Sequence, residues 1–442
     1  MTRRRLILGL CLAVFAFLGF GAVRRVYTQK TDFDGFWRAG RNVLAGRDPY
    51  RDFAPAGEDR VLVPSWRRSA DPAETETGRG FDSAVRRYLP FFPLLMVPFA
   101  LLPMDVAVAL WHLVSVAALL GSVRLAFRLS GRPRGLESSE TIAVLVGTAI
   151  FWADSLTMGQ IGLVTLYLSL AGIDFAGRGR PWLGGILVGL AAAIKVTPAL
   201  VGAYFLLKRR WSAAAAMAGT GVLCALAVIP VWGVGRSVEL HRTWLRESAT
   251  TAGARYFELR ESVRYQNQSL HAFAARFLMD VNAGRSRKPF RINVANLTPE
   301  AVAGVTHAAQ ALLGLALLVA LFARRPDEPL RLSETAVVLG ATTFLSPIAW
   351  TFHLVVMIPA IACLWDRRGE RESRIWLGLA LVFELGLASP WLRALGFLTW
   401  SCLAATVGAW RIAMKERSGP VTARPEPTPA PSATAQGAGT SI

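Results

Sequence analysis

The chain has 442 residues, of which 53% are hydrophobic and 18% are charged, and its formal net charge is +19. The charged residues form short runs between long apolar stretches, which is typical of a membrane protein and not of a water-soluble domain. Most basic residues lie beside apolar segments, where the positive-inside bias and anionic headgroups account for them. We therefore discount nucleic acid as a partner.

Several apolar segments are long enough to cross a hydrocarbon core of about 30 Å. The first follows Arg3 to Arg5 and no small-residue cleavage site ends it, so it is typical of an uncleaved signal anchor. The sequence thus predicts an all-α polytopic membrane protein with about 11 to 13 transmembrane helices, some of them short or broken. The longest apolar segments are 6–26, 104–129, 212–232, 301–323 and 375–410.

The orientation follows from the lysines and arginines of the short loops. With Arg3 to Arg5 in the cytoplasm, the first helix places residue 27 outside, and the other short basic connectors return to the cytoplasm if helical hairpins join them. The connectors are 124–134, 178–180, 208–210, 324–331, 367–374 and 411–417.

Two of these hairpins, 181–207 and 333–365, are too short for two perpendicular spans of about 20 residues each. We expect broken helices around Lys195-Val196-Thr197-Pro198 in the first and around Ser346-Pro347 in the second. Non-helical backbone at membrane depth is tolerated only where it lines a cavity or is buried in protein. The breaks are therefore expected to face inward.

The remaining segments complete a single membrane domain over residues 1–418. Two long polar segments, 27–89 and 233–300, are expected outside the cytoplasm, and the apolar run 90–103 is short enough to be re-entrant or interfacial. Residues 419–442 are rich in Pro, Ala, Thr and Ser and predict a disordered cytoplasmic tail.

Two aspartates follow the first apolar segment, in Thr31-Asp32-Phe33-Asp34-Gly35, ahead of a helical stretch that ends near Gly46. Carboxylates at a helix start cap the free amide hydrogens, and Asp34 suits that role. Asp32 then remains at the membrane surface among aromatic residues, a setting that can tune a general base.

Three polar residues lie where the helices are expected to break or turn. An unpaired ammonium in the apolar run around Lys195 costs roughly 2.5 to 3.5 kcal/mol or more, so this lysine needs a partner, a wet cavity or an interface to which it can snorkel. Gln160 and His353 lie at the apices of other hairpins, although a lone histidine is more often structural than functional.

The second outer segment carries a polar run from Arg255 to Arg276 that includes Arg264, Asn267 and Gln268. Arginine forks match phosphate geometry, so the run suits an anionic lipid headgroup, while a solvated amphipathic helix is the structural alternative. The four cysteines lie in apolar segments without CxxC pairing and are interpreted as packing residues. No metal-ligand cluster or nucleotide-binding signature is present at a usable position.

An ordered set of short motifs spans nearly the whole chain, and together they resemble glycosyltransferase family 87 of the GT-C superfamily. The motifs are Thr31-Asp32-Phe33, the run 39–50 that ends in Asp48-Pro49-Tyr50, Tyr88-Leu89-Pro90, Gly159-Gln160, 185–198 with Lys195, Asn267-Gln268-Ser269, and Ser346-Pro347 through Trp350 to His353.

The resemblance implies a GT-C bundle that moves a sugar, commonly mannose, from a polyprenyl-phosphate donor to a hydroxyl of a lipid or glycan acceptor. Transfer would occur on the extracytoplasmic face of a bacterial plasma membrane, with inversion and without a cofactor or metal. Asp32 maps onto the catalytic base, and charge developing on the departing phosphate calls for cationic donors. The expected roles are catalysis for Asp32 and His353, phosphate binding for Arg264, Lys195, Asn267 and Gln268, and other cavity positions for Asp34, Gln160, Trp350 and Tyr50.

Two other functions fit parts of the pattern. A lipid or oligosaccharide flippase or other transporter would share the many helices, the intramembrane lysine and the broken hairpins, but would not need Asp32 at a helix start. A non-catalytic scaffold would bind lipid headgroups through the run from Arg255 to Arg276.

Overall fold

The structure is a computed structural model that describes residues 31–50, 87–252, 257, 260–284, 288–322 and 328–418. Every regular element in these residues is a helix, and they contain no β-strand. The prediction of an all-α membrane protein is confirmed for this part of the chain. The expected anchor at 6–26, most of the outer segment 27–89, Arg255 and the tail 419–442 lie outside the described residues.

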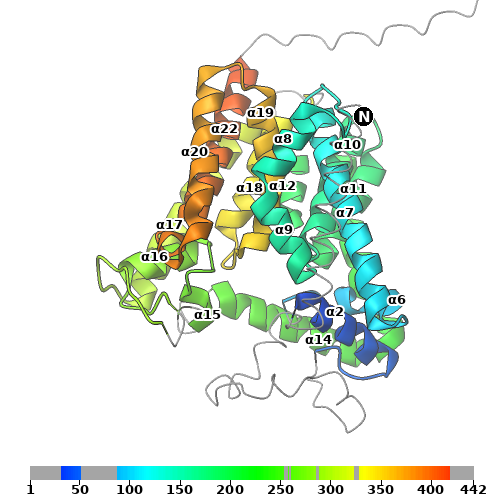
Figure 1. Ribbon diagram of the computed structural model, residues 1–442. Helices are drawn as coiled ribbons and strands as arrows, with labels where there is room; N and C mark the ends of the chain where they lie inside the picture. The colour runs from blue at the N-terminus through cyan, green and yellow to red at the C-terminus, as the bar shows by residue number, and fades with distance from the viewer. Residues whose placement is uncertain are drawn as a thin grey trace, which may run out of the picture.

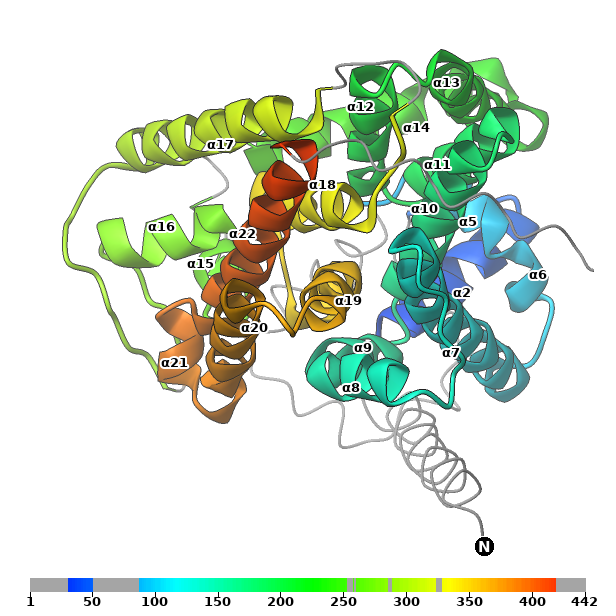
Figure 2. The same ribbon diagram turned by 90° about the horizontal axis from the view of Figure 1, so that it is seen from above.

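The helices of the first half of the chain form one side of a bundle, seen from above in Figure 2. Small residues let them approach closely: a Cβ added to Gly185 of α11 would lie 2.2 Å from the backbone oxygen of Ala213 in α13. These helices are α2 (Asp32–Leu44), α5 (Phe91–Leu95), α6 (Val97–Ala100), α7 (Met104–Leu129), α8 (Ser139–Gly147), α9 (Ala149–Met158), α10 (Gly162–Gly177), α11 (Pro181–Ile194), η3 (Thr197–Ala199), α12 (Leu200–Leu207), α13 (Trp211–Leu226) and α14 (Ile229–Ala252).

The second half of the chain packs against the first through one apolar core that includes residues from α7, α10, α18, α19 and α22. α17 lies at the rim of the bundle in Figure 2, and only 22% of its most apolar 18-residue stretch is buried. The remaining helices are α15 (Arg260–Val263), α16 (Leu270–Leu278), α17 (Pro299–Leu321), α18 (Leu332–Leu345), η5 (Thr351–Met357), α19 (Ile358–Asp366), α20 (Arg371–Phe383), η6 (Glu384–Ala388), α21 (Pro390–Ala394) and α22 (Phe397–Ser418).

Three described helices, α7, α17 and α22, are long and apolar enough to cross a membrane, and the number rises to five if each bent pair is one span. The bent pairs are α8 with α9, at 65°, and α13 with α14, at 95°. The apolar segment 212–232 is therefore not one straight span, because the chain turns sharply before α14. The apolar run 90–103 forms the short helices α5 and α6.

Both expected helix breaks are present. α11 ends at Ile194, Lys195 is extended with φ −143° and ψ 126°, and the chain re-enters a helix through η3. α18 ends at Leu345, Ser346 is also extended, and η5 begins at Thr351. Proline accounts for both breaks. Pro347 restricts Ser346 to extended backbone, and Pro198, which has no amide hydrogen and would clash with the Ile194 carbonyl in a continued α-helix, lies instead in the first turn of η3.

The described basic connectors gather at one end of the bundle, while α2 and α14 lie across the other end (Figure 1). Ion pairs join the connectors to neighbouring helices. Asp174 accepts from Arg128 at 3.3 Å and from Arg178 at 3.1 Å, and Arg132 pairs with Asp366 at 3.6 Å. The connectors at this end are thus tied to the helices beside them by ion pairs.

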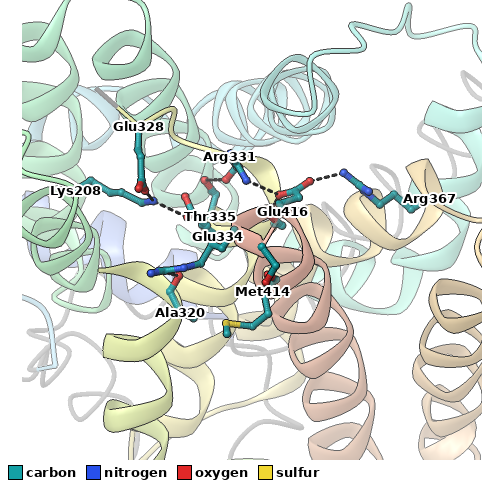
Figure 3. Close-up of polar contacts among 12 residues, drawn as sticks. Lys208, Ala320, Glu328, Arg331, Glu334, Thr335, Arg367, Met414 and Glu416 are labelled. Atoms are coloured by element: carbon teal, nitrogen blue, oxygen red, sulfur yellow. Dashed lines mark hydrogen bonds and ion pairs between the residues drawn. The ribbon is translucent and has the colours of Figure 1, made fainter. Parts of the chain in front are cut away.

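A cluster of ion pairs holds this connector end together (Figure 3). Lys208, which is 1% exposed, donates from Nζ to Glu334 Oε1 at 2.6 Å and to Glu328 Oε2 at 3.0 Å. Glu416, near the end of α22, accepts from Arg367 in the connector before α20. Glu416 also accepts from the hydroxyl of Ser333 in α18 at 2.6 Å, so the cluster fixes the relative positions of α12, α18 and α22.

Candidate active site

The candidate site begins at α2, which presents Asp32 at its first position. The N-cap is Thr31, in extended backbone, and its side chain makes no capping hydrogen bond. α2 packs tightly on the short helices because Gly40 faces α6: a Cβ there would lie 2.8 Å from the Cβ of Ala100. This glycine lets α2 lie against the bundle instead of standing off it.

Aromatic side chains hold α2 in place. Phe36 meets Tyr88 edge to face at 5.2 Å between ring centroids and Phe92 at 4.8 Å, while Phe33 lies 5.4 Å from Trp111. Such pairs contribute about 0.5–1.5 kcal/mol each beyond the area that they bury. These contacts hold α2, and with it the backbone of Asp32, against Tyr88, Phe92 and Trp111.

The interpretation of Asp34 as the helix cap is wrong. Its carboxylate instead accepts from Nε of Arg38 at 2.9 Å, one turn along α2. An acidic residue four positions before an arginine forms this pair readily on a helix surface, and the guanidinium outcompetes the amide hydrogens. Asp32 and Asp34 therefore have different partners.

Gln160 contacts Asp32 directly. α9 ends at Gly159, whose left-handed backbone (φ 63°, ψ 36°) turns the chain so that the next side chain reaches α2. The buried amide of Gln160 donates from Nε2 to Asp32 Oδ2, and its Oε1 accepts from the hydroxyl of Tyr88 at 3.3 Å. Trp111 fixes the turn by donating to the Gly159 carbonyl at 2.8 Å.

The charge of Asp32 is set by burial and by its neighbours. Burial raises the pKa of the Asp32 carboxyl to about 6 from its ordinary 3.8, because desolvation disfavours the charged form. The Gln160 hydrogen bond and the positive charges of Arg87 and Lys195 oppose this rise, whereas the negative charge of Asp154 adds to it. A carboxylate with this pKa is mostly ionised at pH 7 yet holds a proton well enough to act as a base.

Lys195 lies at the break between α11 and η3. It acts electrostatically on both Asp32 and His353. Within the described part of the chain its ammonium group makes no hydrogen bond or ion pair, and its side chain is half-buried. A cation that has no direct partner among the described residues, and whose charge acts on Asp32 and His353, is suited to bind an anionic group.

His353 follows the other break and lies within electrostatic reach of Lys195 and Arg87. Its Nδ1 accepts from the backbone N–H of Trp350 at 3.3 Å. A neutral imidazole that accepts at Nδ1 carries its hydrogen on Nε2. His353 can therefore donate a hydrogen bond through Nε2, as a ligand of an anionic oxygen must.

Asn267 and Gln268 have structural partners. Asn267 Nδ2 donates to the carbonyls of Ser262 and Pro347 at 3.0 and 3.3 Å, and its Oδ1 accepts from the Ala349 N–H at 3.0 Å. Gln268 Nε2 donates to the carbonyls of Tyr265 at 2.6 Å and Arg393 at 2.9 Å. Asn267 supports the turn that leads to His353, and the expected phosphate contacts would require both amides to give up these bonds.

Three further residues were expected to bind the phosphate or line the cavity: Arg264, Tyr50 and Trp350. The guanidinium of Arg264 makes no hydrogen bond or ion pair with the residues that the structure describes, and its Nε is buried, so its role in phosphate binding stays a prediction. Tyr50 donates from its hydroxyl to the Tyr88 carbonyl at 2.9 Å and supports the site from behind. The indole of Trp350 lies parallel to Phe352, with 6.4 Å between ring centroids.

The sequence reasoning missed Arg87 and Asp154, which both act on Asp32. Arg87 directly precedes the motif Tyr88-Leu89-Pro90, and that position was its only signal. The described cysteines, Cys224, Cys363 and Cys402, are free and buried, as expected of packing residues.

Comparison with known proteins places the chain in a family. The model of glycosyltransferase family 87 matches residues 87–347. The chain is 32% identical over 337 residues to a polyprenol-phosphate-mannose-dependent alpha-(1-2)-phosphatidylinositol pentamannoside mannosyltransferase of Mycolicibacterium smegmatis, covering 72% of this chain and 73% of that protein. The protein of the same description from Mycobacterium tuberculosis is 31% identical over 334 residues, covering 72% and 70%.

A third relative, a polyprenol-phosphate-mannose-dependent alpha-(1-2)-phosphatidylinositol mannoside mannosyltransferase of M. smegmatis, is 26% identical over 403 residues, which is 84% of this chain and 79% of that protein. No solved structure matches the chain significantly. The family match includes Gln160 and Lys195, whereas Asp32 and His353 lie outside it. The transporter and scaffold alternatives are thereby set aside: this chain is a glycosyltransferase and belongs to glycosyltransferase family 87.

Proposed function

We propose that this glycosyltransferase moves mannose from a polyprenyl phosphate mannose donor to a hydroxyl of a phosphatidylinositol mannoside. The names of three relatives support both the donor and the acceptor class. The observation that carries the mechanism is the position of Asp32, a carboxylate bonded to Gln160 and acted on by the cations Arg87 and Lys195.

Asp32 is the general base of this reaction. It removes the proton of the acceptor hydroxyl as that oxygen attacks the anomeric carbon from the face opposite the phosphate. The carbon–oxygen bond to the phosphate breaks as the new glycosidic bond forms, so the anomeric configuration inverts. The single displacement needs no covalent intermediate on the enzyme.

Lys195 and His353 stabilise the leaving group. The donor diester carries one negative charge, and polyprenyl phosphate leaves with two, so charge develops on the phosphate oxygens in the transition state. The ammonium of Lys195 and the Nε2–H of His353 are the donors that meet this charge, and preorganised donors of this kind contribute most where charge develops.

The site faces the outside of the cytoplasmic membrane. The positive-inside bias supports a cytoplasmic connector end, and α2, whose first residue is Asp32, lies across the other end of the bundle (Figure 1). Nucleotide sugars are cytoplasmic, so a lipid-soluble donor supplies the sugar where they do not reach.

The direct test uses membranes that contain the full chain, incubated with polyprenyl phosphate [³H]mannose and purified phosphatidylinositol mannosides. The expected result is a labelled lipid longer by one mannose, absent from control membranes. Failure of the label to reach any of these acceptors, with the protein present at normal abundance, would overturn the proposal.

The pH dependence tests the base. Activity, measured as kcat/KM for the acceptor, is expected to fall about tenfold per pH unit below pH 6, because the base must be ionised. Gln160→Met removes a hydrogen bond that lowers the pKa of Asp32, so the acid limb should move to higher pH. If the acid limb of kcat/KM in the wild-type protein lay near pH 4, the ordinary range of an aspartate, Asp32 with a raised pKa would not be the base.

Gly159→Ala tests the approach of Gln160 to α2. The added Cβ would lie 2.6 Å from the Cβ of Phe33, and alanine at φ +63° is strained by about 1–2 kcal/mol. We expect a lower thermal midpoint and a loss of kcat of tenfold or more, because small displacements of reacting groups are costly. Gly46→Ala is the matched control: it has φ +66° and no atom within 4 Å, so it should lose similar stability and keep kcat.

A further inference from the structure

A polar pocket lies between the segment that follows α2 and the part of α14 that follows Gly233. Aromatic rings and charged groups line it together, and ligand sites also combine aromatic surfaces with a few placed polar groups. The polar and aromatic lining comes from Asp48, Tyr50, Arg236, Glu239, Thr243 and Trp244.

The pocket is joined to the candidate active site through the two residues between them. On the pocket side, Tyr50 donates to the Tyr88 carbonyl at 2.9 Å, and Trp244 Nε1 donates to the Arg87 carbonyl at 3.2 Å. On the other side, the Tyr88 hydroxyl donates to Gln160, and the charge of Arg87 acts on Asp32. Arg87 and Tyr88 therefore connect the lining of the pocket to the surroundings of Asp32.

The charges of the pocket select among ligands. Arg236 donates to Asp48 Oδ2 and to Glu239 Oε2 at 2.6 Å, so one guanidinium faces two carboxylates. A phosphate would meet this net negative charge, which is unfavourable. Carboxylate oxygens accept well from neutral hydroxyl groups, and the tyrosine and tryptophan rings offer flat apolar faces.

The position of α14 indicates where the ligand comes from. Val234, Val238 and Leu245 are 64%, 42% and 61% exposed, on a helix that bends 95° away from α13 and lies across the end of the bundle (Figure 1). Exposed apolar residues on such a helix suit the boundary between the acyl chains and the headgroups. The pocket thus lies at the level where the sugars of a glycolipid are found.

We propose that this pocket binds a mannose ring of the acceptor glycan other than the ring that is extended. The inference rests on the proposed function and names the subsite that would hold the acceptor while its reacting hydroxyl meets Asp32. Glu239 and Asp48 accept from the hydroxyls of the ring, and Trp244 and Tyr50 contact its apolar face. The pocket thereby discriminates long from short acceptors.

The test compares Glu239→Gln and Thr243→Val with wild-type protein, using full-length chain in nanodiscs and two acceptors, phosphatidylinositol monomannoside and phosphatidylinositol pentamannoside. For the longer acceptor, Glu239→Gln should raise KM about tenfold, the loss expected for one charge-assisted hydrogen bond, and Thr243→Val should raise it less, while kcat and the donor KM stay within about twofold. The shorter acceptor should be less affected. Arg242→Gln, at an exposed position of the same helix outside the pocket, is the matched control.

Binding of phosphatidylinositol pentamannoside in the absence of donor separates the two proposals. Weaker binding by Glu239→Gln than by wild-type protein supports the subsite even if no mannose is transferred. An unchanged KM and unchanged binding for the longer acceptor overturn the subsite while leaving the transferase proposal intact. Competition by inorganic phosphate that grows stronger in Glu239→Gln would also overturn it, since the pocket would then be an anion site.

Discussion

Asp32→Asn is expected to lower kcat by about 10²- to 10⁴-fold, the range that a positioned general base contributes. Asparagine keeps the size of the side chain and can still contact Gln160, but it cannot accept the proton of the acceptor hydroxyl. The loss should therefore appear in kcat, with the abundance of the protein in the membrane unchanged. Initial rates of [³H]mannose incorporation into phosphatidylinositol mannosides measure it.

Asp34→Asn is the matched control for this substitution. It removes a carboxylate two residues further along α2 that pairs with Arg38, and such helix-surface pairs contribute only about 0.3–0.5 kcal/mol. Its kcat should stay within about twofold of the wild-type value. Equal losses from the two substitutions would show that α2 tolerates no change, and a fully active Asp32→Asn variant would remove the base from the mechanism.

Lys195→Met is expected to lower kcat by about 10²- to 10³-fold, the effect of removing one donor to a developing oxyanion. The same substitution should leave the thermal midpoint unchanged or raise it, because the ammonium of Lys195 makes no hydrogen bond or ion pair within the described residues and is costly to keep away from water. Loss of activity with gain of stability is the signature of a residue kept for function.

Lys208→Met makes the same substitution at a different lysine and is expected to lower stability while activity is kept. Lys208 is buried between Glu334 and Glu328, and removing one partner of a buried pair typically costs about 3–5 kcal/mol. Its thermal midpoint in detergent should fall clearly, while the kcat of the folded fraction should be near that of the wild-type protein. If Lys195→Met were instead the destabilising variant and kept its kcat, Lys195 would be a structural residue.

The long helices and the breaks could be predicted because each has a local cause. The apolar length of 104–129 matches α7, and the prolines at positions 198 and 347 follow the positions where α11 and α18 end. Asp34 shows the limit of such reasoning, because two local partners, the amide hydrogens and Arg38, competed for one carboxylate. The bend after α13 was missed because the apolar composition continues through it.

The site itself depends on contacts between distant residues. Gln160 meets Asp32 across 128 positions, and only the left-handed backbone of Gly159 turns it in that direction. Asn267 and Gln268 looked like ligands because they are polar and lie in an outer segment. Their side-chain amides instead donate to backbone carbonyls in irregular segments, and the sequence does not show which carbonyls lack a helical partner.

The two ends of the bundle are restrained unequally. Lys208, Glu334 and Glu416 staple α12, α18 and α22 beside the connectors, whereas the far ends of α11 and α18 finish in the extended residues Lys195 and Ser346 (Figures 1 and 3). At the far end, Asn267 and Ser269 donate to the Pro347 carbonyl, so the restraints there are hydrogen bonds and not ion pairs. Separating α12 from α18 at the connector end would leave a buried charge of the Lys208–Glu334 pair without its partner, which typically costs about 3–5 kcal/mol. Movements of these helices are therefore least costly where they leave the connector end closed.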